Sequence, residues 1–384
     1  NVPPLRFPEF NGEWEKCTIK DYGEVVTGNT PPTSNSEYYD NGSYLWASPA
    51  DLGISKNITE TKTKLSLSGF RKTRNIPKGS VLITCIGSTI GKMGMATETM
   101  SSNQQINSIV INDKSDSDFV YYAISRAFPR YLSEVGIQAV PILSKSNFEK
   151  LPNYTTCREE QDKIGYFLNL LDERIATQNK IIEDLKKLKS AIIEMEYTHK
   201  TKSNSHIGDF IEQTSKRNKN CAIQNVLSVS NRQGFIQQSE QFENRSVASD
   251  DTSNYKIVEK NDFAFNPARI NVGSIARLTT FDRGIVSPMY ICFRTKDTLF
   301  PEYLDYYFET KQFFTEIQKR LEGSVRQCLS FEGLCNIPLC IPTIEVQRQV
   351  GNQLSTLAQE IKLEIDFLEL LQRQKKFLLH QMFI

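Results

Sequence analysis

The chain has 384 residues, of which 39% are hydrophobic and 24% charged, and its formal net charge is +1. This length suffices for two or three domains that each bury their own core. No run approaches 18 consecutive apolar residues, and the segment Asn1–Arg6 lacks the apolar core of a secretion signal, so a membrane span and export are both disfavoured. We therefore expect a globular cytoplasmic protein that does not contact a membrane.

The first predicted module covers residues 1–153 and mixes strands with helices. Residues Val81–Ile86 and Ile106–Ile111 have the β-branched, apolar composition of strands, and Phe119–Arg130 has the apolar spacing of a helix. Glycine-, serine- and asparagine-rich stretches between them indicate loops.

A long helix is predicted over residues 154–200. Its apolar residues recur in alternating steps of four and three, the spacing of a coiled-coil seam, and Thr156-Cys157-Arg158-Glu159 has a capping-box pattern at its start. The seam positions are Ile164, Leu168, Leu171, Ile175, Ile182 and Leu185.

A second α+β module is predicted over residues 204–340, with strands at Ile275–Leu278 and Tyr290–Phe293 and a helix at Glu302–Gln318. A second long helix follows over 341–384. Its seam positions are Val350, Leu354, Leu357, Ile361, Leu368 and Leu371.

An internal repeat organises this sequence. Gln161 and Gln347 lie 186 residues apart, and the same shift pairs every seam position named for the first long helix with an aliphatic residue of the second. Fainter matches precede each helix: Ile19–Tyr22 with Ile207–Phe210, Lys78–Ile83 with Lys260–Phe265, Phe119–Tyr122 with Tyr303–Tyr306, and Ser144 with Ser330.

This repeat predicts two similar modules held apart by two long antiparallel helices and related by a pseudo-twofold axis. The chain ends should then lie close together. A helix of about 38 residues is on the order of 57 Å long, so the pair would act as a ruler between the modules. Such an arrangement suits a bipartite target on a DNA duplex.

No motif supports catalysis. Ile86–Lys92 resembles a phosphate-binding loop, but it has three residues between its glycines instead of four and Met93 where a serine or threonine is needed. Phe265–Ala268 shares only Asn-Pro with the motif of amino-methyltransferases. The eight cysteines include no C-x-x-C pair and the three histidines are scattered, so we expect reduced thiols and no metal site.

Residues suited to DNA are present in both modules. Between Lys56 and Lys78 there are seven basic residues and one acid, which favours phosphate contact, although such a run can also be a solvated surface. Asparagine, glutamine and arginine can pair with base edges. The DNA-binding candidates are Lys62, Lys64, Arg71, Lys72, Arg74, Ser88, Thr89, Lys92, Asn103, Gln104, Gln105, Gln138, Lys216, Arg217, Lys219, Arg232, Arg269, Asn271, Arg326 and Gln327.

Over nearly its whole length the chain resembles the specificity subunits of type I restriction–modification systems. Leu5–Trp14 is similar to their usual start, Ile86–Lys92 with Asn103–Ile109 and Val272–Ala276 with Val286–Tyr290 are similar to their recognition domains, and Glu160–Ile175 is similar to their helical repeat. In the second helix Ala358 stands where the first has Asp172, so any role of that aspartate is not shared.

The resemblance implies a non-catalytic subunit that reads double-stranded DNA. It implies that each module reads half of a split target, and that the helices set the spacer and dock two adenine-N6 methyltransferase subunits. S-adenosylmethionine, ATP and magnesium would be bound by those subunits and by restriction–translocase subunits, and no cofactor by this chain. Two alternatives stay open: a coiled-coil scaffold that does not bind DNA, and a self-sufficient DNA-modifying enzyme with an unrecognised site.

Overall fold

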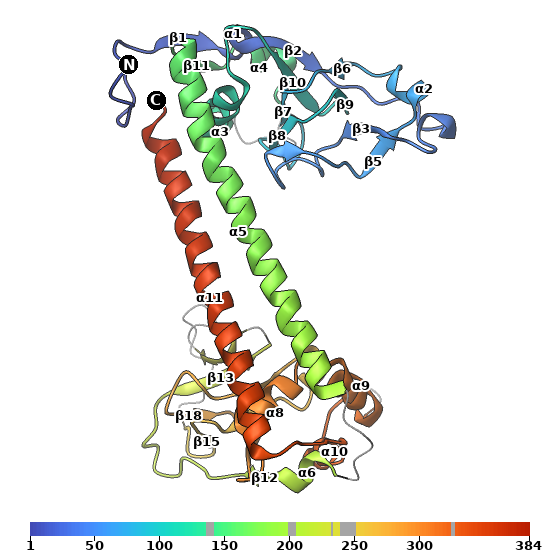
Figure 1. Ribbon diagram of the computed structural model, residues 1–384, viewed down its shortest axis with the longest axis vertical. Helices are drawn as coiled ribbons and strands as arrows, with labels where there is room; N and C mark the ends of the chain where they lie inside the picture. Colours follow the sequence, from blue (N-terminus) through green and yellow to red (C-terminus); the bar gives the residue numbers. More distant parts are fainter. Residues whose placement is uncertain (136–141, 199–204, 232, 239–250, 324–326) are drawn as a thin grey trace. The chain divides into compact units, whose positions relative to one another are not determined.

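The two heptad segments each fold as one unbroken helix. α5 (Arg158–Thr198) has 41 residues and α11 (Ile344–Gln381) has 38. The structure, a computed structural model, describes residues 1–135, 142–198, 205–231, 233–238, 251–323 and 327–384 (Figure 1). Within these ranges no helix combines the length and the apolar character that a bilayer crossing requires.

The chain divides into two units that each contain one module and part of both long helices. The first unit is Asn1–Lys180 with Asp366–Ile384, and the second is Ile181–Ile365. Each has mixed helices and sheets, so the predicted α+β class with two sheet-containing modules is confirmed. The predicted module limits at residues 153, 204 and 340 stay predictions, because the units divide within the helices.

The first unit has two main sheets and a short ribbon. The larger sheet has the order β2 (Gly23–Thr27), β10 (Ile106–Ile111), β7 (Val81–Thr84), β8 (Met93–Ala96), β4 (Asn57–Ile58). The smaller has the order β5 (Thr63–Leu65), β3 (Tyr44–Ala47), β9 (Met100–Ser102), β6 (Asn75–Ile76). The ribbon pairs β1 (Glu15–Thr18) with β11 (Pro152–Thr155).

The second unit also has two sheets. One has the order β12 (Ile211–Thr214), β19 (Ile291–Thr295), β16 (Phe263–Phe265), β17 (Ile275–Arg277). The other has the order β14 (Gly234–Gln237), β13 (Val226–Ser230), β18 (Arg283–Val286), β15 (Lys256–Glu259).

These sheets have the same topology in both units. The order β2-β10-β7-β8 matches β12-β19-β16-β17, and all of these neighbours are antiparallel. In the other four-stranded sheet of each unit, β3 and β9 are parallel and flanked by antiparallel strands, as are β13 and β18. The two modules are therefore copies of one fold, as the sequence repeat predicts, with β4 an addition in the first.

The helices of the modules repeat as well. Ser144 and Ser330 cap α4 (Lys145–Glu149) and α10 (Phe331–Cys335), each accepting a hydrogen bond from the backbone three residues on. The described residues of the modules also form α1 (Ile19–Tyr22), η1 (Ser36–Tyr38), α2 (Leu67–Phe70) and the 19-residue α3 (Ser117–Val135) in the first, and α6 (Ile207–Phe210), η2 (Ile270–Val272), α8 (Pro301–Tyr307) and α9 (Lys311–Arg320) in the second.

Two local predictions were wrong. The helix predicted at Glu302–Gln318 is two helices, α8 and α9, because the Thr310 hydroxyl accepts the Phe313 N–H at 3.1 Å and starts a new helix. The capping box predicted at Thr156 does not form, because α5 begins at Arg158 and the Thr156 hydroxyl bonds to Glu160 instead.

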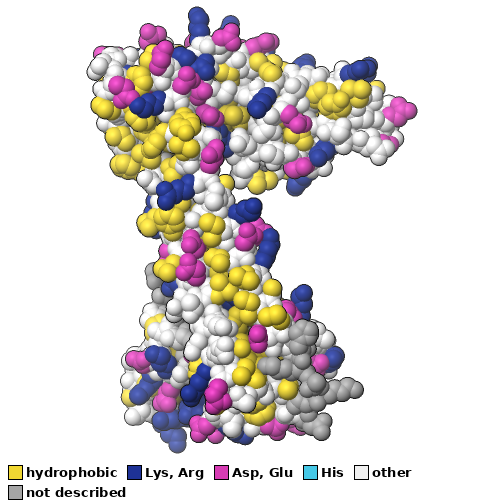
Figure 2. Space-filling model, in the orientation of Figure 1, with side chains coloured by type: hydrophobic (Ala, Val, Ile, Leu, Met, Phe, Trp, Pro, Cys, Tyr) yellow, Lys and Arg dark blue, Asp and Glu magenta, His cyan; other side chains and the backbone are white. Residues whose placement is uncertain are grey.

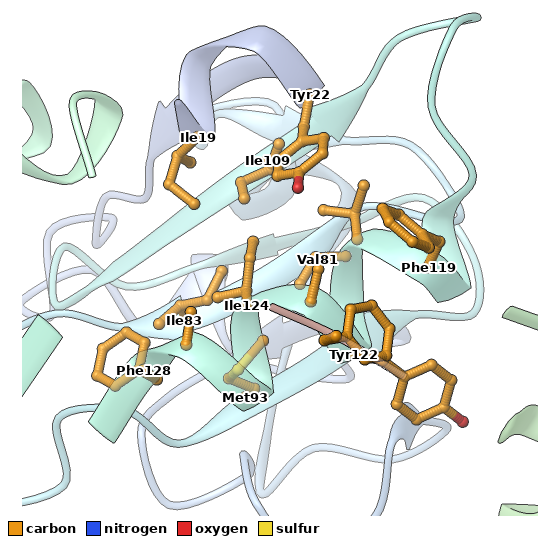
Figure 3. Packing of buried hydrophobic residues seen from close by; sticks show 14 of the residues in the cluster. Ile19, Tyr22, Val81, Ile83, Met93, Ile109, Phe119, Tyr122, Ile124 and Phe128 are labelled. Atoms are coloured by element: carbon orange, nitrogen blue, oxygen red, sulfur yellow. The ribbon is translucent and has the colours of Figure 1, made fainter. Parts of the chain in front are cut away.

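The main core of the first unit lies between the larger sheet and the helices. In Figure 3, Val81, Ile83 and Ile109 of the sheet face Tyr122 and Phe128 of α3. Leu168 and Leu171 of α5 and Leu371 and Leu378 of α11 join the same core. A second cluster of apolar residues fills the space between the two sheets. The second unit repeats both clusters, with the end of α5 and the start of α11 in the corresponding place.

Contacts within the first unit define the helix directions. Lys375 pairs with Asp172, and the Arg174 guanidinium lies 5.4 Å from the ring centre of Phe367. Positions further along α5 thus meet earlier positions on α11, so the helices are antiparallel, as predicted. The chain ends also meet in this unit, because the Leu5 N–H donates to the Gln381 carbonyl at 2.9 Å and Trp14 packs on Phe383.

Candidate nucleic-acid interface

In the first unit the loop after β2 packs tightly against the loop between β9 and β10. A Cβ on Gly28 would lie 2.3 Å from the carbonyl oxygens of Ser102 and Asn103, so only glycine allows this approach. The Asn29 N–H donates to the Ser102 carbonyl at 2.9 Å. These contacts fix the backbone of residues 28–30 beside the candidate residues of the β9–β10 loop.

Asn29 connects this loop to the basic stretch before β6. Its side-chain Nδ2 donates to the Lys72 carbonyl at 2.9 Å and its Oδ1 accepts the Arg74 N–H at 2.8 Å. The Arg74 guanidinium donates to the Thr27 carbonyl at 2.9 Å and remains largely exposed. Lys72 and Arg74 therefore lie beside the end of β2, with their charges open to solvent.

The three polar candidates at 103–105 have different surroundings. Asn103 is buried, and both its amide nitrogen and its oxygen bond to Gln105, so this side chain shapes the loop. Gln104 is exposed and accepts a hydrogen bond from the Thr30 hydroxyl at 2.5 Å. Gln105 extends toward Gly87 of the β7–β8 loop, where a Cβ would lie 3.6 Å from its amide nitrogen.

The glycine-rich segment Ile86–Lys92 is the connection between β7 and β8. Gly87 and Gly91 have φ of +96° and +91°, and the N–H groups of Ile90, Gly91 and Lys92 bond within the turn. These donors serve the turn and are not directed at a ligand. Ser88 and Lys92 are exposed and Thr89 is half-buried, so the turn presents polar side chains next to Gln105.

Other basic candidates of the first module lie apart from this group. Lys64 pairs with Glu60 at 2.8 Å, and the Lys62 backbone N–H donates to Asp51. Arg71 is exposed at the end of α2. Lys56, which belongs to the same basic stretch, is buried and pairs with Asp118 at 2.5 Å, which removes it from any surface contact.

In the second unit the candidates occupy the corresponding loops. Lys216, Arg217 and Lys219 follow β12 and are exposed, with the Arg217 guanidinium donating to Asn254 at 3.0 Å. Arg269 and Asn271 lie in the β16–β17 connection. Gln327 is exposed and lies two residues before Leu329, whose N–H donates to the Pro267 carbonyl of the same connection at 3.0 Å. Gln138, Arg232 and Arg326 lie outside the described residues.

Sequence reasoning missed Asn29 and Thr30, which organise the first group. A signal was present: aligning Ile19 with Ile207 places Asn29 opposite Arg217, a candidate in the other module. In each module, the loop after β2 or β12 and the β7–β8 or β16–β17 connection, with their neighbours, offer arginine or lysine for phosphates and amide side chains for base edges.

The twelve predicted helix-packing positions are all buried or half-buried. Each module also contacts the long helices through a matching pair. The Lys375 ammonium lies 5.7 Å from the Tyr122 ring centre, and Lys189, its counterpart 186 residues earlier, lies 5.0 Å from that of Tyr306.

Asp172 adds a contact that the second unit lacks at Ala358. Its carboxylate accepts the Tyr122 hydroxyl at 2.6 Å. Burial and the nearby Asp172 charge raise the pKa of Tyr122 far above its ordinary value, which keeps it a hydrogen-bond donor.

Comparison with known proteins finds several relatives. Residues 11–187 match the family model described as type I restriction modification DNA specificity domain. The HindI specificity subunit of Haemophilus influenzae is 31% identical over 38% of this chain and 32% of its own length. The MjaIX specificity subunit of Methanocaldococcus jannaschii is 32% identical over 46% and 42%. The chain thus spans about a third of the length of the first relative and about two fifths of the second.

Solved structures share the fold over the whole chain. A type I restriction–modification S subunit from M. genitalium superposes with a TM-score of 0.65 at 16% identity, covering 100% of this chain and 99% of that one. A chain from a structure of type I R-M complex assembly and conformational transition gives 0.56 at 12% identity, with 98% of each covered.

Proposed function

Because the chain belongs to the family of type I restriction–modification specificity subunits, we propose that it selects the DNA sequence on which such a complex acts. Each module reads one half of a bipartite target in double-stranded DNA. The reading surface is the end of the module that carries the loop after β2 or β12, the β7–β8 or β16–β17 connection, and the β9–β10 or β18–β19 connection.

One observation carries this proposal: the two modules share their strand order but differ in the side chains at matching loop positions. Asn29 in one corresponds to Arg217 in the other, and the turn with Ser88 and Lys92 corresponds to the one with Arg269 and Asn271. A shared scaffold with different hydrogen-bonding groups suits two half-sites of different sequence. The near-neutral net charge fits a chain whose partners add phosphate contacts.

The long helices are proposed to fix the spacer between half-sites and to dock two adenine-N6 methyltransferase subunits. Leu370 and Phe377 lie seven residues apart on the part of α11 in the first unit and are exposed, which places them on one face of that helix. Figure 2 shows hydrophobic side chains gathered on the outer surface of part of the helices. Exposed apolar groups of this kind are typical of protein–protein contacts.

The chain's own part is recognition and assembly. The methyltransferase subunits would bring S-adenosylmethionine, and restriction–translocase subunits would bring ATP and magnesium. The residues at the proposed DNA surface bind and orient the duplex and do not take part in the transfer of a methyl group.

The test combines the chain with a methyltransferase subunit and maps methylated adenines in DNA, with binding measured on a duplex that contains the mapped site. Lys72→Glu with Arg74→Glu should weaken binding by about 100-fold at low salt, because two phosphate contacts become repulsive. Lys150→Glu is the matched control, since Lys150 is exposed at α4, which contacts β2 and α1 rather than the loop end.

Two results would overturn the proposal. If the double charge reversal left DNA binding and methylation unchanged, this surface would not contact DNA. The chain would then act as a scaffold that binds only protein. If the purified chain methylated or cut DNA without a partner, it would be an enzyme in its own right.

A further inference from the structure

A cavity of about 410 Å³ opens between the two sheets of the second unit. It is bounded by Ser228 of β13, by Asn266 and Arg269 of the β16–β17 connection, and by Ser287 and Met289 of the β18–β19 connection. Two of the three loops that form the proposed reading surface thus also form this cavity. Its volume is within the usual range for small-ligand sites.

Asn266 brings an unused hydrogen-bond donor to the cavity. It is only 6% exposed, its Oδ1 accepts the Ala268 N–H at 3.1 Å, and its backbone N–H donates to the Ser274 carbonyl. Its Nδ2 donates to no residue that the structure describes. Because Asn266 lines the cavity, this amide is available to a polar partner that enters from outside.

The walls and the rim have complementary chemistry. Val272 and Met289 come from two different loops, line the cavity, and are 54% and 57% exposed, an unusual placement for apolar side chains at the edge of a polar site. Arg269 is exposed and forms no ion pair with a described acidic residue. The site therefore offers apolar surfaces for a flat ring, an amide donor for a ring acceptor, and a cation at the entrance for a phosphate.

We propose that this cavity binds one nucleobase of the target DNA after that base has swung out of the duplex. The inference rests on the proposed DNA-reading function and extends it, because it adds an extrahelical contact to readout in the groove. Extruded bases are held by stacking on apolar or aromatic side chains and by hydrogen bonds to their polar edge. The ring lies between Val272 and Met289, the Asn266 Nδ2 donates to a ring nitrogen or carbonyl, and Arg269 contacts the flanking phosphate.

The test measures binding of the full chain to a labelled 24-base-pair duplex of arbitrary sequence that carries one unpaired 2-aminopurine, and to the same duplex fully paired. The bulged duplex should bind about tenfold more tightly, because its base is already unpaired, and the 2-aminopurine emission should change on binding. Asn266→Asp keeps the Oδ1 acceptor and removes the donor. Met289→Ala removes one wall. Each should abolish the preference, which is the ratio of the affinities for the bulged and paired duplexes; this ratio is the readout because both residues lie in loops of the proposed reading surface.

Met195→Ala is the matched control, since Met195 is similarly exposed but lies on α5, and it should keep the preference. Equal affinity of the unaltered chain for both duplexes overturns the cavity proposal and leaves the proposed function standing. Binding to neither duplex overturns both. A preference that survives in both cavity variants shows that the base binds elsewhere and overturns the cavity proposal. Binding of 2-aminopurine riboside monophosphate is measured in parallel. If the chain binds this nucleotide but does not prefer the bulged duplex, the cavity is a free-nucleotide site instead.

Discussion

Gln161 and Gln347 make the same three hydrogen bonds in the two units. The Gln161 amide donates to the Thr156 carbonyl at 2.7 Å and the Lys114 carbonyl at 3.4 Å, and its oxygen accepts the Asp116 N–H at 2.9 Å. Gln347 does the same with Pro342, Thr298 and Phe300, at 2.9, 3.1 and 2.8 Å. Each glutamine joins the first turn of a long helix to the loop before α3 or α8.

The first prediction concerns this joint. Gln161→Ala and Gln347→Ala should each lower the free energy of unfolding by about 2–3 kcal/mol, because buried backbone groups lose their partners. Urea titration followed by circular dichroism measures the loss. Gln349→Ala, on the exposed side of the same helix, should change stability by less than about 0.5 kcal/mol. A loss confined to one of the two glutamines would contradict an equivalent role.

Much of the fold was predictable because both long helices carry strong heptad patterns and because the repeat aligns short anchors. Ser144 and Ser330 are such anchors, and both cap a helix. The sheet order was not predictable, since parallel pairing of β3 with β9 joins strands that are far apart in the sequence. The site was predicted only in part. Asn29 and Thr30 gain their role from contacts with Lys72 and Gln104 that form in the folded chain alone.

A second prediction concerns Arg6 and Glu160. Arg6 donates two hydrogen bonds to the fully buried Glu160 carboxylate, at 2.6 and 2.7 Å. Burial opposes ionisation of Glu160, but the hydrogen bonds from Arg6 and Thr156 outweigh it, and its pKa is lowered. Stability from this pair is therefore fully present above the unfolded pKa of about 4.3 and is lost as pH falls through the lower folded pKa.

Arg6→Met should accordingly lower the free energy of unfolding by about 3 kcal/mol at pH 7, because it leaves a buried charge without its partner. The difference from the unaltered chain should shrink below about pH 4.3. Chemical denaturation between pH 3 and pH 7 measures it. Lys163→Met removes an exposed pair with Glu9 and should have little effect at any pH. A difference for Arg6→Met that stays constant across this range would count against the assigned cause.

A third prediction concerns the asymmetry at Asp172 and Ala358. Asp172 accepts the Tyr122 hydroxyl and pairs with Lys375, whereas Lys189 in the second unit pairs with Glu309 of its own module's α8–α9 connection. A double-mutant cycle with Asp172→Ala and Lys375→Met should give a coupling energy of about 1–2 kcal/mol. The same cycle with Ala358→Asp and Lys189→Met should show no comparable stabilising coupling, since Lys189 already has an acidic partner. Equal couplings would mean that Asp172 gives the first unit no additional connection to its helices.

The last prediction tests whether the helices set the spacer. Seven residues inserted after Asn179 and seven after Ile365, positions 186 residues apart, keep the heptad register in both helices and lengthen each by about 10.5 Å. At about 3.4 Å per base pair, the spacer between methylated half-sites should grow by about three base pairs while the half-sites keep their sequence.

An insertion in one helix alone is the control for that experiment, because it shifts one seam against the other and should abolish selection of any single spacer. Methylation mapping of DNA exposed to the chain and its methyltransferase partner measures both variants. The outcome follows from antiparallel pairing: since each unit contains the start of one helix and the end of the other, only equal insertions preserve the contacts inside both. A spacer that did not change with the double insertion would show that the modules, and not the helices, determine the distance between half-sites.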